Sequence, residues 1–182
     1  MYVDIDPEDY HVLHPRPVYL IVSRKGDRLN VMSASWVTPV SDDPPLVAVS
    51  IWRKSLTYEY IMESKEFTIN VVNDSMVNIV YRAGTVSGRE IDKFRELGLE
   101  VIPSKKIKTP GVKDVLGFLE CVLEKSVMVG ESDLLIARVV ATHVDQNYYE
   151  RYGWNLRKTS ILLHAGGKAF VTTGRLVFPS KK

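Results

Sequence analysis

A short polar loop holds the residues of this chain that are best suited to bind a charged group. It spans residues 50–57 (Ser-Ile-Trp-Arg-Lys-Ser-Leu-Thr), between a segment typical of a strand and one typical of a helix. The first amides of a helix lack partners within it, and with the helix dipole they favour an anion. Hydroxyl groups and two cations at the same place suit a phosphate. The loop alone still favours a simpler explanation, in which Ser55 caps the helix and Arg53 and Lys54 lie in water.

Other side chains able to do chemistry also have plain structural explanations. Trp36 and Trp52 stand on predicted strands beside the loop, where tryptophan usually serves a core or a dimer interface. Cys121 lies among apolar residues, which indicates an inert core thiol. A strand end is enough to explain His164, and a helix start is enough to explain residues 87–89 (Ser-Gly-Arg).

Several familiar sites are missing from the sequence. No glycine occurs between Gly26 and Gly84, which argues against the glycine-rich turn of a Rossmann dinucleotide site. Residues 166–168 (Gly-Gly-Lys) lack the remaining residues of a P-loop, and no G-x-S-x-G elbow of a serine hydrolase is present. One cysteine and four scattered histidines supply no evident metal-ligand set, so no metal site is predicted.

Composition places the chain among soluble globular proteins. Its 182 residues suit a single domain, and a net charge of +2 gives no field of the kind that nucleic-acid binders use. The single cysteine excludes an internal disulfide and is compatible with a reducing compartment. The acidic first nine residues do not resemble a signal peptide, and the apolar runs are too short to span a bilayer. We therefore expect a cytoplasmic protein without nucleic-acid or membrane partners.

The pattern of apolar residues predicts hairpins of strands with a few helices. Predicted strands are residues 17–24, 29–37, 46–52, 66–72, 117–129, 133–145, 160–164 and 169–172. Predicted helices are residues 56–64, 75–83 and 89–98. Because the strands do not alternate with helices, the sequence predicts a mainly β fold, an antiparallel barrel with a few helices.

An ordered set of segments resembles the flavin reductase-like family of FMN-binding split β-barrels, which includes ferric reductase-like proteins and flavoredoxins. The matching segments are residues 16–22, 30–36, 38–47, 50–57, 66–71, 87–94 and 163–168. The resemblance implies an antiparallel split barrel of the Greek-key type, with residues 1–182 as one domain and residues 1–16 as an N-terminal arm. It also implies a homodimer that holds FMN in a groove near the subunit interface.

The resemblance assigns cofactor contacts to four parts of the chain. Those implied to line the flavin ring are Met32, Ser33, Ala34, Ser35 and Trp36. The implied phosphate loop comprises Ser50, Ile51, Trp52, Lys54, Ser55 and Thr57, with its polar members on the phosphate. Near the phosphate or ribityl chain the resemblance places Ser87, Gly88 and Arg89. From the last strands it places His164 and Gly166 near the ring.

One segment departs from the family pattern. Members that use NADH well often carry Gly-Asp-His in the turn between the two long strands, where this chain has Gly130, Glu131 and Ser132. The missing histidine does not affect the implied FMN binding, but it leaves the identity of the electron donor open.

The implied activity is that of an FMN-dependent oxidoreductase. Electrons would pass from NADH or NADPH through FMN to free flavin, a ferric chelate or a protein, and no catalytic side chain is required because the flavin carries the chemistry. One alternative is a non-enzymatic FMN-binding electron carrier. Another is a barrel without a cofactor that binds some other phosphate.

Overall fold

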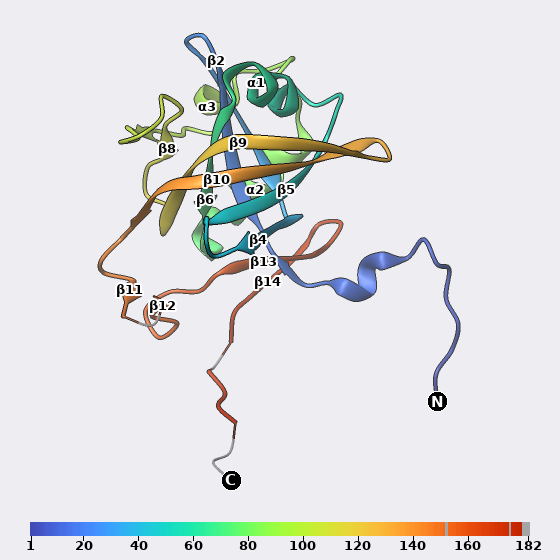
Figure 1. Ribbon diagram of the computed structural model, residues 1–182. Coiled ribbons are helices and arrows are strands. Elements are labelled where there is room, and N and C mark those ends of the chain that lie inside the picture. The colour runs from blue at the N-terminus through green and yellow to red at the C-terminus, as the bar shows by residue number, and fades with distance from the viewer. Residues whose placement is uncertain (152, 175, 180–182) are drawn as a thin grey trace.

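An antiparallel sheet of seven strands forms the body of the molecule (Figure 1). The computed structural model describes residues 1–151, 153–174 and 176–179. In chain order the strands of this sheet are β2 (Tyr19–Lys25), β3 (Arg28–Ala34), β4 (Val37–Ser41), β5 (Leu46–Trp52), β6 (Glu66–Val71), β9 (Gly117–Val129) and β10 (Ser132–Val144). Their order in space is β3-β2-β6-β9-β10-β5-β4. The predicted mainly β, antiparallel fold is confirmed.

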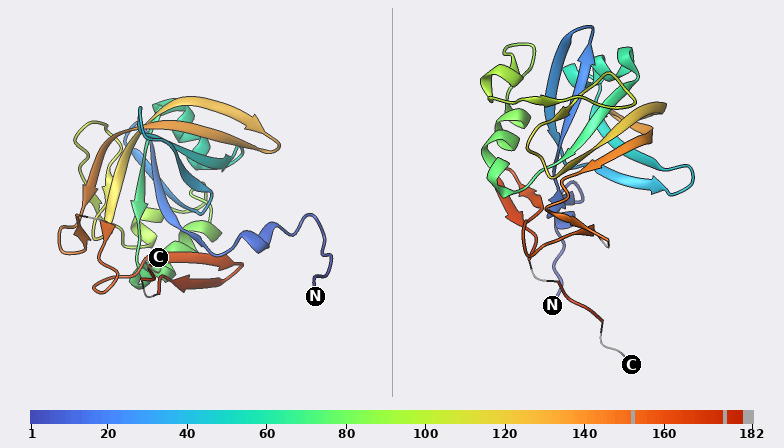
Figure 2. Two further views of the ribbon diagram at one scale, coloured as in Figure 1. Left: turned by 60° about the horizontal axis from the view of Figure 1, so that its bottom comes forward. Right: turned by 90° about the vertical axis from the view of Figure 1, so that its left-hand side faces the viewer.

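The two edge strands of this sheet are consecutive in the sequence. Only Ser35 and Trp36 separate the end of β3 from the start of β4, so the two edges must approach each other at that end. The Ser50 amide of β5 donates to the Trp36 carbonyl at 3.0 Å and secures the connection. The sheet therefore curls into a split barrel, and Figure 2 shows the strands curving around a common interior.

Three helices and two 3₁₀ turns accompany the barrel in the described residues. They are η1 (Tyr10–Leu13), α1 (Leu56–Ser64), η2 (Asp74–Met76), α2 (Val77–Thr85) and α3 (Lys93–Glu96). Helix α1 begins where Ser55 accepts a hydrogen bond from the Tyr58 amide, and it ends at Lys65 in the left-handed conformation. None of the helices in the described ranges has the length and apolar character needed to cross a membrane.

Three small sheets complete the described structure. One contains β1 (Arg16–Pro17), β13 (Leu162–Gly166) and β14 (Ala169–Thr172), and the two others pair β7 (Val101–Ile102) with β8 (Gly111–Val112) and β11 (Tyr149–Glu150) with β12 (Gly153–Trp154). In the views of Figure 2 the β13–β14 hairpin lies next to α2 below the barrel. Leu162 and Phe170 of this hairpin pack in the same apolar cluster as Val80 of α2.

The strand and helix predictions differ from the structure in two informative places. The strand predicted for residues 29–37 ends at Ala34, because the chain leaves one edge of the sheet there and joins the other as β4. Of the helix predicted for residues 89–98, only Lys93–Glu96 is helical, as α3. The first part of the predicted helix is a turn instead, in which the Ser87 carbonyl accepts from the amides of Glu90 and Ile91. Asp92 then caps α3 by accepting from the amides of Phe94 and Arg95.

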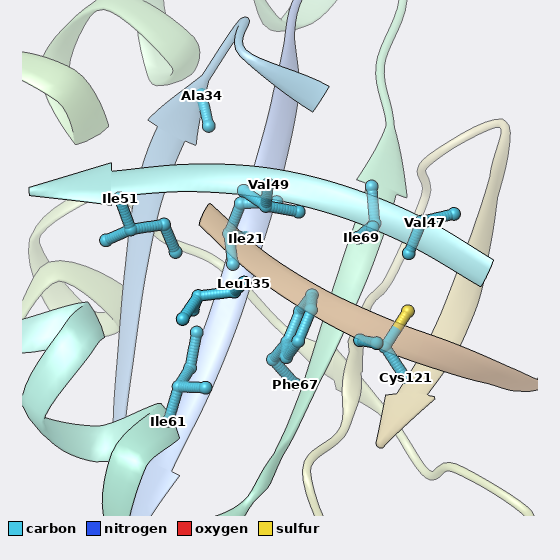
Figure 3. Packing of buried hydrophobic residues seen from close by; sticks show 11 residues of the cluster. Ile21, Ala34, Val47, Val49, Ile51, Ile61, Phe67, Ile69, Cys121 and Leu135 are labelled. Atoms are coloured by element: carbon cyan, nitrogen blue, oxygen red, sulfur yellow. The ribbon is translucent and has the colours of Figure 1, made fainter. Parts of the chain in front are cut away.

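Apolar residues pack on both faces of β2. Ile21 belongs to the cluster inside the barrel with Phe67, Leu135 and, from α1, Ile61 (Figure 3), whereas Leu20 and its like-facing neighbours pack toward α2. Alternating side chains reach opposite faces of a strand, so β2 and its partner β3 are held between two cores. This packing holds β3, the strand along which the candidate site lies, in a fixed position.

Cys121 lies in the interior cluster and is fully buried (Figure 3). Burial raises the pKa of its thiol, which keeps the thiol in its unreactive, protonated form. The prediction of a core thiol is confirmed.

Candidate functional site

A groove in two parts runs along β3. The first part, here called the basic cavity, has a volume of about 350 Å³ and lies between Asn30, the start of α1, the end of α2 and residues 87–89. The second, here called the aromatic cavity, has a volume of about 260 Å³ and is lined by Tyr81, His164 and Phe170 with residues 33–35. The two cavities share Ser33, Gly84 and Thr85. Small-molecule sites are commonly of this combined size.

Positive charge is concentrated in the basic cavity. Lys54, Arg89 and Lys93 line it, and no aspartate or glutamate occurs among its described lining residues. The cavity also includes the beginning of α1, a helix of nine residues whose first amides are free of helical partners. Charge and dipole therefore both favour an anion in this cavity.

The loop before α1 divides its two cations between different tasks. Arg53 turns away to the β9–β10 hairpin, where its Nη2 donates to the Gly130 carbonyl at 2.8 Å. Lys54 lines the basic cavity. The structure also bears out the simple explanation for Ser55, which caps α1 through a bond of 3.1 Å from the Tyr58 amide. The hydroxyl of Ser55 keeps its own proton for another acceptor.

Asn30, Thr57 and Gly88 meet at the floor of the basic cavity. The Asn30 amide nitrogen donates to Thr57 Oγ1 at 2.7 Å, and both residues are almost fully buried. Because Thr57 Oγ1 accepts this bond, its own proton is available to an acceptor in the cavity. Asn30 Oδ1 is buried and has no partner among the described residues, so it can accept a hydrogen bond from a bound hydroxyl group.

Gly88 approaches this pair so closely that a side chain here would displace Asn30. A Cβ at this position would lie 2.1 Å from Asn30 Oδ1 and 3.0 Å from Leu56 Cδ2. The missing side chain therefore makes room for the Asn30 amide itself. This gives Gly88 a structural reason that does not depend on the resemblance.

Lys93 is a buried cation that the sequence did not single out. Its Nζ donates to the Val31 carbonyl at 2.9 Å and to the Ala83 carbonyl at 2.7 Å, which ties α3 to β3 and α2. Burial lowers the pKa of Lys93 to about 8. Two of its three N–H groups are used by these carbonyls, and the side chain also borders the basic cavity.

Arg89 borders the basic cavity through an exchangeable ion pair. Its Nη2 lies 2.9 Å from Glu59 Oε2, and Glu59 also pairs with Lys25. These hydrogen bonds, from Arg89 first and Lys25 second, lower the pKa of the Glu59 carboxyl. The side chains are half-exposed, so the pairs contribute little to stability and Arg89 can turn to a ligand at low cost.

The aromatic cavity is narrow because α2 lies close to β3. Ser33 Oγ donates to the Val80 carbonyl, and a Cβ at Gly84 would lie 3.4 Å from the Ser33 Cβ. His164 Nε2 lies 3.2 Å from the Gly167 carbonyl, which places its ring at the edge of this cavity.

Most of the residues that the resemblance implied line the groove, and four do not. The lining residues are Met32, Ser33, Ala34, Ser35, Trp52, Lys54, Ser55, Thr57, Ser87, Gly88, Arg89 and His164. Ser50, Ile51, Trp36 and Gly166 line neither cavity. Strand alternation directs the Ile51 side chain into the barrel core, where it is 1% exposed, so only the backbone of Ile51 is left to contact a cofactor, and that contact stays a prediction.

The other three residues stand close to the groove without lining it. Trp36 is 45% exposed and receives the edge of Tyr10 and the guanidinium of Arg16 instead of the core. Ser50 holds the Trp36 carbonyl, and Gly166 lies beside His14. Their contacts with a cofactor stay predictions.

One known protein family matches most of this chain. Residues 11–172 match the flavin reductase like domain, and the chain belongs to that family. An uncharacterised protein of Pyrococcus abyssi is 36% identical over 165 residues, which cover 91% of this chain and 94% of the relative.

Two solved structures share the fold over nearly their whole length. Nitrilotriacetate monooxygenase component B of Bacillus cereus has a TM-score of 0.88 at 26% identity, covering 98% of this chain and 99% of that one. An FMN-binding protein of Thermus thermophilus has a TM-score of 0.87 at 23% identity, covering 99% of each chain.

Proposed function

We propose that the chain binds FMN in the groove, with the phosphate in the basic cavity and the flavin ring toward the aromatic cavity. One observation carries this proposal: three cations, the start of α1 and no described acidic residue surround the basic cavity. A phosphate matches this donor set in charge and in hydrogen-bond chemistry. FMN binding by the structural neighbour from Thermus thermophilus supports the choice of flavin.

The residues of the groove also suit the rest of the cofactor. The unpartnered Asn30 Oδ1 needs a hydrogen-bond donor, and the hydroxyl groups of a ribityl chain are donors. Small residues, Ser33 and Ala34 on β3, Ser35 just after it and Gly84 on α2, leave room between strand and helix for a flat ring. These are the residues expected to hold FMN.

Each group has a definite task in this proposal. Bound flavin supplies hydride and one-electron chemistry. Lys54, Arg89 and the first amides of α1 hold the phosphate, and Lys93 contributes a positive charge from behind the groove. No side chain has to act as an acid or a base, so the work of the chain is binding and orientation.

We further propose that the protein is an oxidoreductase that passes electrons from NADH or NADPH to a second acceptor, such as free flavin, a ferric chelate or a protein. The family and its monooxygenase-component neighbour support a redox role. The turn of Gly130 and Glu131 favours the second candidate, a non-enzymatic FMN-binding carrier, because it lacks the histidine of members that use NADH well.

Purification of the protein separates these candidates. We expect a yellow protein that takes up FMN stoichiometrically and loses its absorbance near 450 nm when NADH or NADPH is added without oxygen. Retained colour with both nucleotides leaves the carrier. A colourless protein that binds inorganic phosphate but no FMN points to the phosphate-binding module.

We propose a homodimer in the cytoplasm, with residues 1–182 forming one domain. The N-terminal segment extends from the barrel (Figure 1) and exposes large apolar side chains, among them Val12 at 72% and Leu13 at 66%. Such side chains are usually covered by a partner, and a second copy of the chain is the occupant that the family suggests. Residues 152, 175 and 180–182 of the proposed domain lie outside the described residues.

A further inference from the structure

A second groove adjoins the basic cavity at the end that lies away from the aromatic cavity. It is here called the outer groove and consists of two overlapping cavities of about 810 and 540 Å³. They lie between α1, the β2–β3 turn and residues 88–94. Leu56, Gly88 and Arg89 line both the basic cavity and the outer groove, so they mark the junction. A ligand that extends beyond a phosphate in the basic cavity would enter the outer groove at this junction.

The balance of charge reverses between the two spaces. The described lining residues of the basic cavity include three cations and no aspartate or glutamate. Those of the outer groove include five acidic residues and three basic ones, namely Asp27, Glu59, Glu63, Glu90 and Asp92 against Lys25, Arg28 and Arg89. Arg89 stands at the junction and belongs to both linings. The outer groove is therefore net negative, whereas the basic cavity is positive.

Glu59 and Glu63 supply the negative charge on the α1 side of the outer groove. They are four residues apart on this helix, so their side chains share one face. Arg89 Nη2 lies 2.9 Å from Glu59 Oε2, which places this carboxylate directly behind a cation of the proposed phosphate site. Lys25 Nζ lies 3.3 Å from Glu59 Oε1 and 2.7 Å from Glu63 Oε2. Because one lysine cannot neutralise two carboxylates, the pair stays net negative when Arg89 turns to a bound phosphate.

We propose that Glu59 and Glu63 make the site selective for FMN over FAD. FAD carries a second phosphate and an adenosine beyond the phosphate that FMN also has, and these groups would have to enter the outer groove. Repulsion between the second phosphate and the two carboxylates weakens FAD binding, whereas FMN ends inside the basic cavity. The inference rests on the proposed function and adds to it the residues that choose between the two flavin nucleotides.

Calorimetric titration with FMN, FAD and the methyl ester of FMN tests the proposal. The methyl ester is a phosphodiester, as FAD is, but it lacks the second phosphate and the adenosine. It therefore corrects for the charge that FAD has lost at its first phosphate. We expect wild type to bind FAD about tenfold more weakly than the methyl ester. Glu59→Gln with Glu63→Gln should raise the affinity for FAD about fivefold relative to that for the methyl ester.

Glu100→Gln is a matched control, because Glu100 pairs with Lys113 and lines neither the basic cavity nor the outer groove. It should leave the ratio of the two affinities unchanged. Both glutamates of the double variant are half-exposed, and retained FMN binding shows that this variant folds.

Two results would overturn the proposal. One is wild-type affinity for FAD equal to that for the methyl ester, since the outer groove then repels nothing. The other is an unchanged ratio in the double variant, since shape rather than charge then excludes the nucleotide.

Failure of this inference can be told from failure of the proposed function. A protein that binds none of the three flavins refutes the proposed function. A protein that binds FMN, and binds FAD as tightly as the methyl ester, refutes only the selectivity assigned to Glu59 and Glu63.

Discussion

Gly88 lets a turn pack directly against the buried pair of Asn30 and Thr57 in the proposed FMN site. It passes so close to Asn30 Oδ1 that a Cβ would collide with it, and this buried oxygen has no hydrogen-bond partner among the described residues. Thr57 completes the arrangement by accepting the Asn30 amide. The three residues come from a strand, a helix and a turn that are distant in the sequence, so the site depends on the correct packing of all three.

We expect Gly88→Ala to lower the free energy of unfolding by about 1–3 kcal/mol, the usual range for overpacking. FMN binding should weaken as well, because Asn30 must move. Urea denaturation and FMN titration measure the two effects. Gly174→Ala is a control, since no atom lies within 4 Å of a Cβ built there. Equal behaviour of the two variants would show that the Gly88 turn relaxes freely.

Lys93 predicts a pH dependence of stability at high pH. Its pKa is about 8 in the folded chain and 10.5 when unperturbed, so between these values the unfolded chain binds more protons and the contribution of Lys93 to stability rises with pH. We expect the unfolding free energy of wild type relative to Lys93→Met to increase by about 1–3 kcal/mol from pH 7 to pH 10.

Urea denaturation at several pH values measures this difference. Lys125→Met, a substitution of an exposed lysine on β9, should show no such trend. A difference between wild type and Lys93→Met that stays constant with pH would mean that Lys93 is not desolvated in the folded chain.

The side chain of Arg53 acts as a clamp that joins the loop before α1 to the tip of the β9–β10 hairpin. Arg53 bonds from the loop before α1 to the Gly130 carbonyl and to Met128 Sδ, and its Nε lies 3.7 Å from Asp133 Oδ1. The β9–β10 hairpin tip is therefore tied to the same loop that supplies Lys54 to the basic cavity. Arg53 therefore connects the proposed phosphate site with the turn at Gly130 and Glu131, where this chain departs from the family pattern.

Removal of this clamp should loosen the hairpin tip locally. We expect Arg53→Ala to speed amide hydrogen exchange at residues 128–132 about tenfold with little change in global stability. Lys54→Ala should leave that exchange unchanged and weaken FMN binding instead. Hydrogen-exchange mass spectrometry separates the two variants, and identical exchange in wild type and Arg53→Ala would remove the clamp from the explanation.

The sequence predicts elements better than it predicts the polar residues between them. Helix α1 and its Ser55 cap follow from local residue types, and the burial of Ile51 follows from alternation with its neighbours. Lys93 and Asn30 do not, because a polar residue is buried only where distant groups satisfy it. The carbonyls of Val31 and Ala83 that hold Lys93 come together only in the folded chain.

The molecule as a whole is a split barrel that exposes apolar side chains in the N-terminal segment and at the tip of the β9–β10 hairpin. Its edges meet through Ser35 and Trp36, next to the groove and to the exposed N-terminal segment. The hairpin tip adds exposed apolar side chains, including Met128 at 69% and Val129 at 58%. Subunit association would cover surfaces of this kind and bring a second chain near the groove.

We expect the protein to be dimeric at micromolar concentration, with twice the chain mass of 20.6 kDa in sedimentation equilibrium. Val12→Asp with Leu13→Asp should shift the equilibrium toward monomer, because buried apolar contacts would be replaced by charges. Val40→Asp, at an exposed position on β4, is the comparison variant. A wild-type protein that stays monomeric at high concentration would exclude the homodimer.

The central claim, that the basic cavity holds the phosphate of FMN, is tested most directly by titrating FMN and riboflavin in parallel. The two ligands differ only in the phosphate. We expect wild type to bind FMN far more tightly than riboflavin. The double variant Lys54→Ala, Thr57→Ala should lose about 1–3 kcal/mol of FMN affinity and little riboflavin affinity. Equal affinity of wild type for the two ligands, or equal losses for both in the variant, would contradict the assignment of the phosphate to this cavity.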